Sequence, residues 1–119
     1  MTKPNRPADI FLRFLQLAEA VRGLPPLPAL DPLEERILML VARAGQERER
    51  LSVRDMMAKH ELGAPATVHS RLKSMREKGW ITLADTEDGR RKQVELTQEA
   101  LQHFDKLSQC MVKAAKSVS

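Results

Sequence analysis

Apolar side chains recur at helical spacing in five stretches of this chain, and between the last two stretches the spacing changes to two. The helical stretches predict helices over residues 8–22, from 32 toward Gly45, from 53 toward His60, over 65–78 and from 98 onward. Alternating apolar and polar residues over 81–84 and 93–96 predict two short strands. The pattern therefore favours a mostly α-helical fold with one small two-stranded β-hairpin.

Residues that favour helix starts stand directly before two of these stretches. Asp31 is followed by Pro32 and Glu34, which is the pattern of an N-cap, a first-turn proline and a capping box. Ser52 and Asp55 repeat the capping-box spacing before the short third helix. We therefore expect both helices to begin at these caps.

Stop signals separate the predicted elements. Gly45 and Gly79 follow the second and fourth helical stretches and are expected to end them. The run Leu-Pro-Pro-Leu-Pro at 24–28 predicts an extended connector, because proline cannot continue a helix. Thr97 is expected to cap the last helix, and Trp80 to pack in the core where the chain enters the hairpin.

A short helix, a tight turn, a longer helix and a hairpin are the parts of a winged helix-turn-helix. The Asp88-Gly89 pair supplies the positive φ that a hairpin turn requires. We expect three regions: an N-terminal helix and Pro-rich connector for dimerisation (1–30), a winged helix-turn-helix DNA-binding domain (31–97) and a C-terminal dimerisation helix (98–119).

Composition narrows the classes of function. With 119 residues the chain has the length of one domain, and a single Cys excludes an internal disulfide framework. The most apolar stretch, 10–21, is too short and too polar to span a bilayer, and the first eight residues do not resemble a signal peptide. An aromatic content of 3% disfavours single-stranded nucleic acid as a partner. We expect a cytoplasmic protein that does not bind membranes.

Positive charge is concentrated in two places. The net charge is only +4, but residues 51–79 carry six Lys or Arg against three Asp or Glu, and Arg90, Arg91 and Lys92 are consecutive. On a winged helix, 65–78 would be the recognition helix in the major groove and the wing, 85–93, would lie on the backbone or minor groove.

The residues expected to contact double-stranded DNA are polar or basic and lie on these elements or at the start of the short helix. They are Ser52, Thr67, His69, Ser70, Arg71, Lys73, Ser74, Arg90, Arg91 and Lys92. The alternative for these residues is that they form ordinary solvated faces, and that the wing cations only discourage strand pairing.

Enzymatic and metal chemistry have no supporting motif. His60, His69, His103 and Cys110 do not have the spacing of a metal site, and no phosphate-binding loop or catalytic triad pattern is present. Cys110 is interpreted as a small buried or interfacial thiol, with a redox role as the alternative. We expect no enzymatic activity, no cofactor and no metal, and the sequence does not decide whether a small-molecule effector binds.

The segments that follow the second helix resemble a known family. LSVRDMMA at 51–58, APATV at 64–68, EKGWI at 77–81 and DGRRKQVELT at 88–97 are similar to the MarR-type winged helix-turn-helix transcriptional regulators, over about residues 31–115. The resemblance implies a cytoplasmic bacterial transcription regulator that dimerises through its first and last helices. It also implies DNA contacts by Thr67, Ser70, Arg71, Lys73, Arg90 and Arg91.

The first and last helices carry more apolar surface than a core of this size consumes, which independently predicts a homodimer. We therefore predict a sequence-specific regulator of transcription that binds double-stranded DNA. Two alternatives remain: a winged helix used as a protein-interaction module, and a phage- or replication-type DNA-binding subunit.

Overall fold

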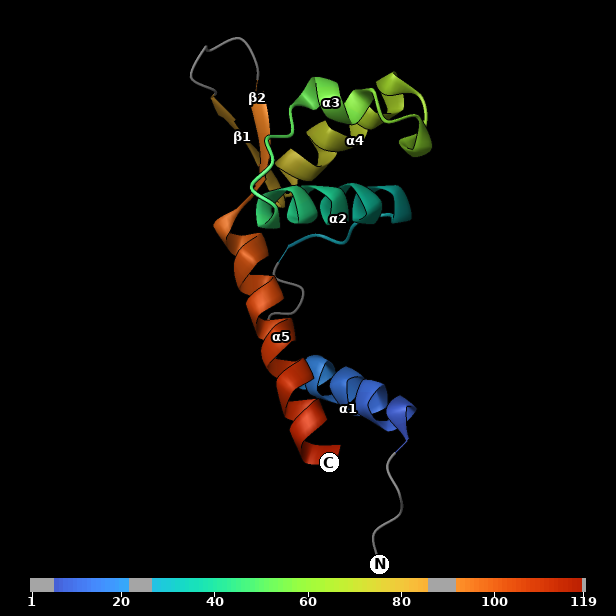
Figure 1. Cartoon of the computed structure of the whole chain (residues 1–119), viewed down its shortest axis with the longest axis vertical. Helices are drawn as coiled ribbons and strands as arrows, with labels where there is room; N and C mark the ends of the chain where they lie inside the picture. The colour runs from blue at the N-terminus through green and yellow to red at the C-terminus, as the bar shows by residue number, and fades with distance from the viewer. Residues whose placement is uncertain (1–5, 22–26, 86–91, 119) are drawn as a thin grey trace, which may run out of the picture. The chain divides into compact units, whose positions relative to one another are not determined.

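The computed structural model describes residues 6–21, 27–85 and 92–118. In chain order their elements are α1 (Pro7–Ala20), α2 (Pro32–Gln46), α3 (Val53–Met57), the 3-10 helix η1 (His60–Leu62), α4 (Pro65–Glu77), β1 (Ile81–Asp85), β2 (Lys92–Leu96) and α5 (Gln98–Val118) (Figure 1). The predicted mostly helical fold with one hairpin is confirmed.

The chain forms two compact units, which we describe separately. One unit consists of Leu27–Ala100, and the other of Met1–Pro26 together with Leu101–Ser119. In the first unit α3 and α4 lie on one side of α2, and the hairpin stands at the end of this helical layer (Figure 1). Its core is built from apolar residues of every element: Ile37, Leu38, Val41, Met56, Leu62, Val68, Leu72, Met75, Trp80, Ile81 and Val94.

Both predicted capping boxes are present. The Asp31 carboxylate accepts a hydrogen bond from the Glu34 amide at 2.8 Å, and the Glu34 carboxylate accepts one from the Asp31 amide at 2.9 Å. Ser52 and Asp55 make the same reciprocal pair at 3.0 and 2.9 Å. These bonds satisfy amides that no helical carbonyl can reach, so they fix where α2 and α3 begin.

The prediction that Gly45 ends α2 is wrong. The helix continues through Gly45 to Gln46, and the residue with positive φ is Arg48, at 57°. The amide of Glu49 bonds the Ala44 carbonyl at 2.8 Å, which closes the turn around Arg48. The left-handed residue that terminates a helix is usually but not always Gly, and here the turn forms three residues later than expected. By contrast, Gly79 has φ 88° and directly follows the last turn of α4, as predicted.

The short third helix ends earlier than expected. α3 closes at Met57, and the chain continues through a turn into η1, whose C-cap Gly63 has φ 112°. Pro65 then occupies the first position of α4, after Ala64, which makes no side-chain cap. The turn between α3 and α4 therefore depends on the backbone freedom of Gly63 and the fixed φ of Pro65.

The hairpin pairs its strands antiparallel with Leu83 opposite Val94. The loop before α3 pairs with the edge of β2, because the Val94 amide donates to the Leu51 carbonyl at 2.7 Å. The predicted Asp88-Gly89 turn lies outside the described residues. At the end of β2, the Thr97 hydroxyl accepts from the Ala100 amide at 3.1 Å, so Thr97 caps α5 as predicted.

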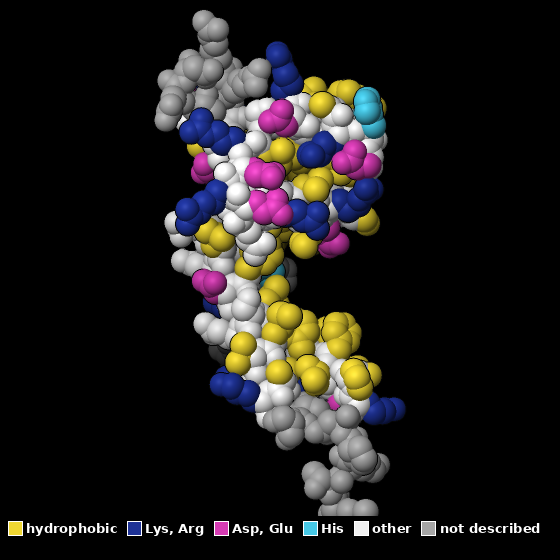
Figure 2. Space-filling model, viewed as in Figure 1, with side chains coloured by type: hydrophobic (Ala, Val, Ile, Leu, Met, Phe, Trp, Pro, Cys, Tyr) yellow, Lys and Arg dark blue, Asp and Glu magenta, His cyan; other side chains and the backbone are white. Residues whose placement is uncertain are grey.

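The second unit presents apolar side chains to the surface. α1 has no buried residue, and Phe11 is 58% exposed. Along α5, Cys110 and Ala114 are buried, whereas Met111 and Val112 are exposed. Figure 2 shows hydrophobic side chains gathered on this unit. Among the described residues no helix has the length and apolar content needed to cross a bilayer.

The buried core predicts that shortening the side chain of Ile37 in α2 strongly lowers the stability of the fold. Ile37 is fully buried, so Ile37→Ala should lower the free energy of unfolding by about 2–5 kcal/mol through lost burial and a cavity. Met39 on the same helix is 64% exposed, and Met39→Ala should change it by less than about 0.5 kcal/mol. Urea unfolding followed by circular dichroism measures both, and equal losses would contradict the described core.

Candidate nucleic-acid interface

One face of α4 packs inward and the other meets solvent. Val68, Leu72 and Met75 are buried, as their spacing predicts. The residues expected to contact DNA that are exposed on α4 are Thr67, His69, Ser70 and Lys73. All four lie on the helix that follows the tight turn.

The exposed surface of α4 also includes a cation that was not among the expected DNA contacts. Arg76 is exposed and lies three residues after Lys73, which itself lies four residues after His69. Residues three and four apart share one face of a helix. The spacing of His69, Lys73 and Arg76 was therefore sufficient to find this stripe, which we call the outer stripe.

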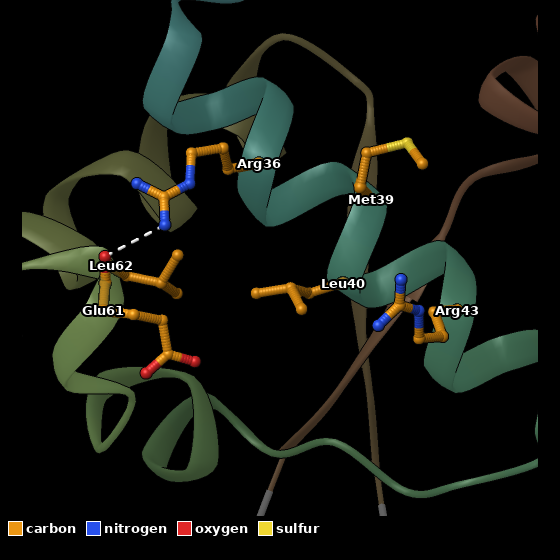
Figure 3. A pocket seen from close by; sticks show the side chains of 6 residues that line it. All are labelled: Arg36, Met39, Leu40, Arg43, Glu61 and Leu62. Atoms are coloured by element: carbon orange, nitrogen blue, oxygen red, sulfur yellow. Dashed lines mark hydrogen bonds between the residues drawn. The ribbon is translucent and has the colours of Figure 1, made fainter.

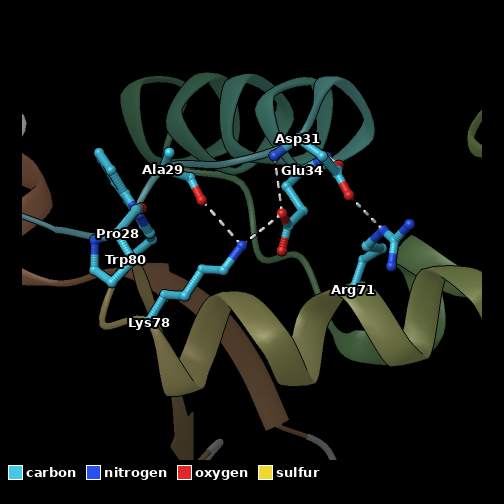
Figure 4. A network of polar contacts seen from close by, with 7 residues as sticks. All are labelled: Pro28, Ala29, Asp31, Glu34, Arg71, Lys78 and Trp80. Carbon is cyan, nitrogen blue, oxygen red and sulfur yellow. Dashed lines mark hydrogen bonds and ion pairs between the residues drawn. The ribbon is translucent and has the colours of Figure 1, made fainter.

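Arg71 lies on a different side of α4 from the outer stripe. Its Nε is 2.8 Å from Oδ2 of Asp31, the residue that caps α2 (Figure 4). The contact is an ion pair without an aligned hydrogen bond at Nε. Both side chains are about 40% exposed, at 41% for Arg71 and 37% for Asp31, so the pair stands at the surface.

Ser74 and Lys78 continue the side of α4 that faces α2. The Lys78 ammonium donates to Glu34 Oε1 at 2.9 Å and to the Ala29 carbonyl at 3.0 Å (Figure 4). Ser74 is half-buried and helps to lower the pKa of the Glu34 carboxyl, so it lies toward α2 and not on the outer surface where we expected it. The sequence signal for this contact was limited to the capping box, which predicted a helix start but no partner in α4.

Glu34 stays ionised although it is 1% exposed. Burial acts to raise the pKa of Glu34, but hydrogen bonds from the Asp31 amide, Lys78 and Ser74 outweigh burial, and the pKa lies below its ordinary value. The buried carboxylate therefore holds Lys78 as an ion pair at neutral pH.

Trp80 joins the same region to the end of α4. Its ring is buried, as predicted, and its Nε1–H donates to the Pro28 carbonyl at 2.7 Å. The segment before α2 is thus fixed to the end of α4 by both Lys78 and Trp80. This attachment sets the position of α4 relative to α2.

Two other predicted DNA contacts have partners within the protein. Ser52 is buried, and its hydroxyl and amide are both used in the capping box with Asp55. Lys92 forms an ion pair with Asp85, its cross-strand partner at the end of the strands next to the hairpin loop. Arg90 and Arg91 lie outside the described residues.

A shallow groove of about 210 Å³ opens between α2 and η1 (Figure 3). It is lined by Arg36, Met39, Leu40, Arg43, Glu61 and Leu62. The Arg36 guanidinium donates to the Glu61 carbonyl at 3.1 Å and closes one end of the groove. The described residues include no group of three or more His, Cys, Asp or Glu side chains that could hold a metal ion.

Comparison with solved structures identifies the fold. A mutant of Lactococcus lactis ZitR matches with a TM-score of 0.54 and 22% identity, covering 76% of this chain and 58% of that one. Another ZitR mutant matches with a TM-score of 0.51 and 22% identity, covering 92% and 76%. The adhesin competence repressor AdcR from Streptococcus pyogenes matches at 0.50 and 22%, covering 92% and 73%.

The chain spans less than two thirds of the first ZitR chain, and at 22% identity these likenesses show the fold alone. Neither the protein-family models nor the curated proteins include a match to this sequence. The predicted winged-helix fold is confirmed, with α3 and α4 as its helix-turn-helix and β1 and β2 as its wing strands.

The Glu34–Lys78 pair predicts a change in acid stability. A carboxylate whose pKa is lowered on folding contributes stability above its unfolded pKa, and loses that contribution as pH falls through the folded pKa. Lys78→Met removes a charged partner of Glu34, so the free energy of unfolding near neutral pH should fall by about 1–3 kcal/mol. Without Lys78 the folded pKa of Glu34 rises toward its unfolded value, so the stability difference between Lys78→Met and wild type should shrink as pH falls and Glu34 becomes protonated.

Urea unfolding over a pH series measures this change. Lys73→Met removes an exposed ammonium from the same helix and serves as the matched control, with little effect on stability at any pH. The two variants would behave alike if the Glu34–Lys78 pair contributed nothing.

Proposed function

We propose that this protein is a sequence-specific regulator of transcription of the MarR type, which binds double-stranded DNA as a homodimer in the bacterial cytoplasm. The observation that carries the proposal is the outer stripe of α4, where His69, Lys73 and Arg76 are exposed on the second helix of a winged helix-turn-helix. The name of AdcR as a repressor accords with a regulatory role.

The proposed contacts follow from the shape of duplex DNA. A helix such as α4 fits the major groove, where Lys and Arg can donate to guanine and Ser and Thr can bond bases or phosphates. We assign Thr67, Ser70, Arg71 and Lys73 to these contacts, with His69 beside them. Wing residues Arg90 and Arg91 would contact the backbone or the minor groove, whereas Lys92 can do so only if it leaves Asp85.

Exposed cations favour nucleic acid over a protein partner for this surface. The centre of a protein–protein interface is depleted in Lys, whereas α4 exposes Lys73 on its outer stripe. A phage- or replication-type subunit would share the DNA contact, and it would differ in the sequence that it selects. The proposal is therefore tested first by DNA selection.

A homodimer would explain the exposed apolar residues of the second unit. Phe11, Leu12 and Leu15 on α1 and Met111 and Val112 on α5 are exposed, and a two-fold axis could bury these side chains on both copies. Two recognition helices would then be presented to successive turns of the major groove, which favours a pseudo-palindromic site.

Selection from random duplexes, read by sequencing, should recover a pseudo-palindromic consensus. On the recovered duplex, Arg71→Ala should cost about 1–3 kcal/mol of binding free energy if Arg71 reads a base. Lys73→Ala should lower the slope of log affinity against log salt by about 1, because one fewer counterion is released. Fluorescence anisotropy measures both values.

Lys113→Ala provides the matched control, since Lys113 is exposed on α5 in the other unit and is not among the proposed DNA contacts. It should leave affinity and salt slope unchanged. If Arg71→Ala, Lys73→Ala and Arg90→Ala all bound the duplex like wild type at low salt, the proposed DNA face would be wrong.

The dimer surface is tested by placing a charge on α1. Phe11→Glu should raise the dimer dissociation constant at least about ten-fold, because a carboxylate would be buried in an apolar contact. Met39→Glu makes the same change at an exposed position of the other unit and should leave the constant unchanged. Sedimentation equilibrium measures both, and a dimer unaffected by Phe11→Glu would have to use another surface.

A further inference from the structure

The two oxygens of the Asp31 carboxylate have different partners. Oδ1 accepts the Glu34 amide at 2.8 Å, which caps α2. Oδ2 lies 2.8 Å from Nε of Arg71 on α4. One side chain therefore both starts one helix and holds a cation of the other.

The contact at Nε leaves the far end of the guanidinium uncovered. In Figure 4 the two terminal nitrogens of Arg71 point away from Asp31. These nitrogens form the fork with which arginine donates two parallel hydrogen bonds to O6 and N7 of guanine. Because the Arg71 side chain is 41% exposed, the fork can reach a ligand without breaking the ion pair.

The carboxylate that holds Arg71 is itself fixed. The Asp31 amide donates to Glu34 Oε1 at 2.9 Å, and the same oxygen accepts from Lys78 at 2.9 Å. Asp31 is therefore tied to α2 through its cap and, through Glu34, to the end of α4. An arginine held by such a partner loses less rotamer freedom when it binds a ligand.

We propose that Asp31 is a positioning residue that presents the terminal nitrogens of Arg71 to a guanine edge in duplex DNA, and so contributes to sequence discrimination. This inference rests on the proposed DNA-binding function. Asp31 touches no base itself and acts through Arg71. If Asp31 instead held Arg71 away from DNA, removing its charge would strengthen DNA binding, whereas a positioning role predicts weaker binding.

Asp31→Asn separates the two tasks of this residue. Asparagine is as good an N-cap as aspartate, so the start of α2 is retained, but the negative partner of Arg71 is lost. Glu35→Gln is the matched control, because it removes an exposed carboxylate from the same helical turn. Asp31→Ser, which also keeps a cap and lacks the charge, serves as a second variant if Asp31→Asn folds poorly.

The probes are the duplex recovered by selection and a scrambled duplex of the same length and composition. Asp31→Asn should weaken binding to the selected duplex by about ten-fold, the scale of one charge-assisted hydrogen bond, and leave the scrambled duplex unaffected. Glu35→Gln should leave the ratio of the affinities for the two duplexes unchanged. In an Arg71→Ala background, Asp31→Asn should have no further effect on discrimination.

Several outcomes would overturn the proposal. Tighter binding of both duplexes by Asp31→Asn would show that Asp31 withholds Arg71. An equal loss on both duplexes would place Arg71 on a phosphate, and an undiminished loss in the Arg71→Ala background would show that Asp31 does not act through Arg71.

Failure of this inference can be distinguished from failure of the proposed function. If no duplex binds the wild-type protein, DNA binding is wrong and the positioning role is wrong with it. If duplexes bind normally and Asp31→Asn leaves discrimination unchanged, only the positioning role is wrong. The Nε–H resonance of Arg71 in the free protein provides an independent readout, since it should shift in Asp31→Asn and remain in place in Glu35→Gln.

Discussion

The reciprocal capping of Asp31 and Glu34 is the interaction on which the arrangement of the winged helix depends. Each residue satisfies the backbone amide of the other, which fixes both carboxylates at the first turn of α2. The two carboxylates then engage Arg71 and Lys78, which stand two turns apart on α4. The two residues that cap the start of α2 are thus also the residues to which α4 is attached.

Because of this attachment, the two sides of α4 differ in what they contact. The side that carries Ser74 and Lys78 is occupied by contacts with α2, whereas the outer stripe is available to a ligand. Arg71 lies on the side that faces α2, three residues before Ser74, with one edge of its guanidinium paired to Asp31. Because the buried Glu34–Lys78 pair and Trp80 hold the end of the helix, the exposed cations are carried on a rigid support.

Features set by neighbouring residues could be predicted from the sequence. The capping boxes, the inward face of α4, the hairpin strands and the burial of Trp80 depend on local spacing and composition. The end of α2 could not be predicted as well, because Arg48 adopts the left-handed conformation that Gly45 was expected to supply. Turn geometry there is decided by backbone bonds across several residues.

The polar partners of the candidate site were less predictable, for a physical reason. Lys78 and Glu34 are 44 residues apart, and no periodicity relates residues on two packed helices at that separation. The orientation of Ser74 and the pairing of Lys92 with Asp85 have the same origin, since each depends on which element lies opposite. Sequence spacing located the basic residues but could not say which of them pair with a carboxylate in the folded protein.

The hydroxyl of Thr97 links the start of α5 to the residue that follows α4. It donates to the Gly79 carbonyl at 2.6 Å while it accepts from the Ala100 amide. One atom thus joins the residue that ends α4 to the first turn of α5. A chimera that grafts this winged helix onto another C-terminal helix would therefore have to retain Thr97 and its spacing to Ala100, because a flexible linker at this point would leave both helix ends unsatisfied.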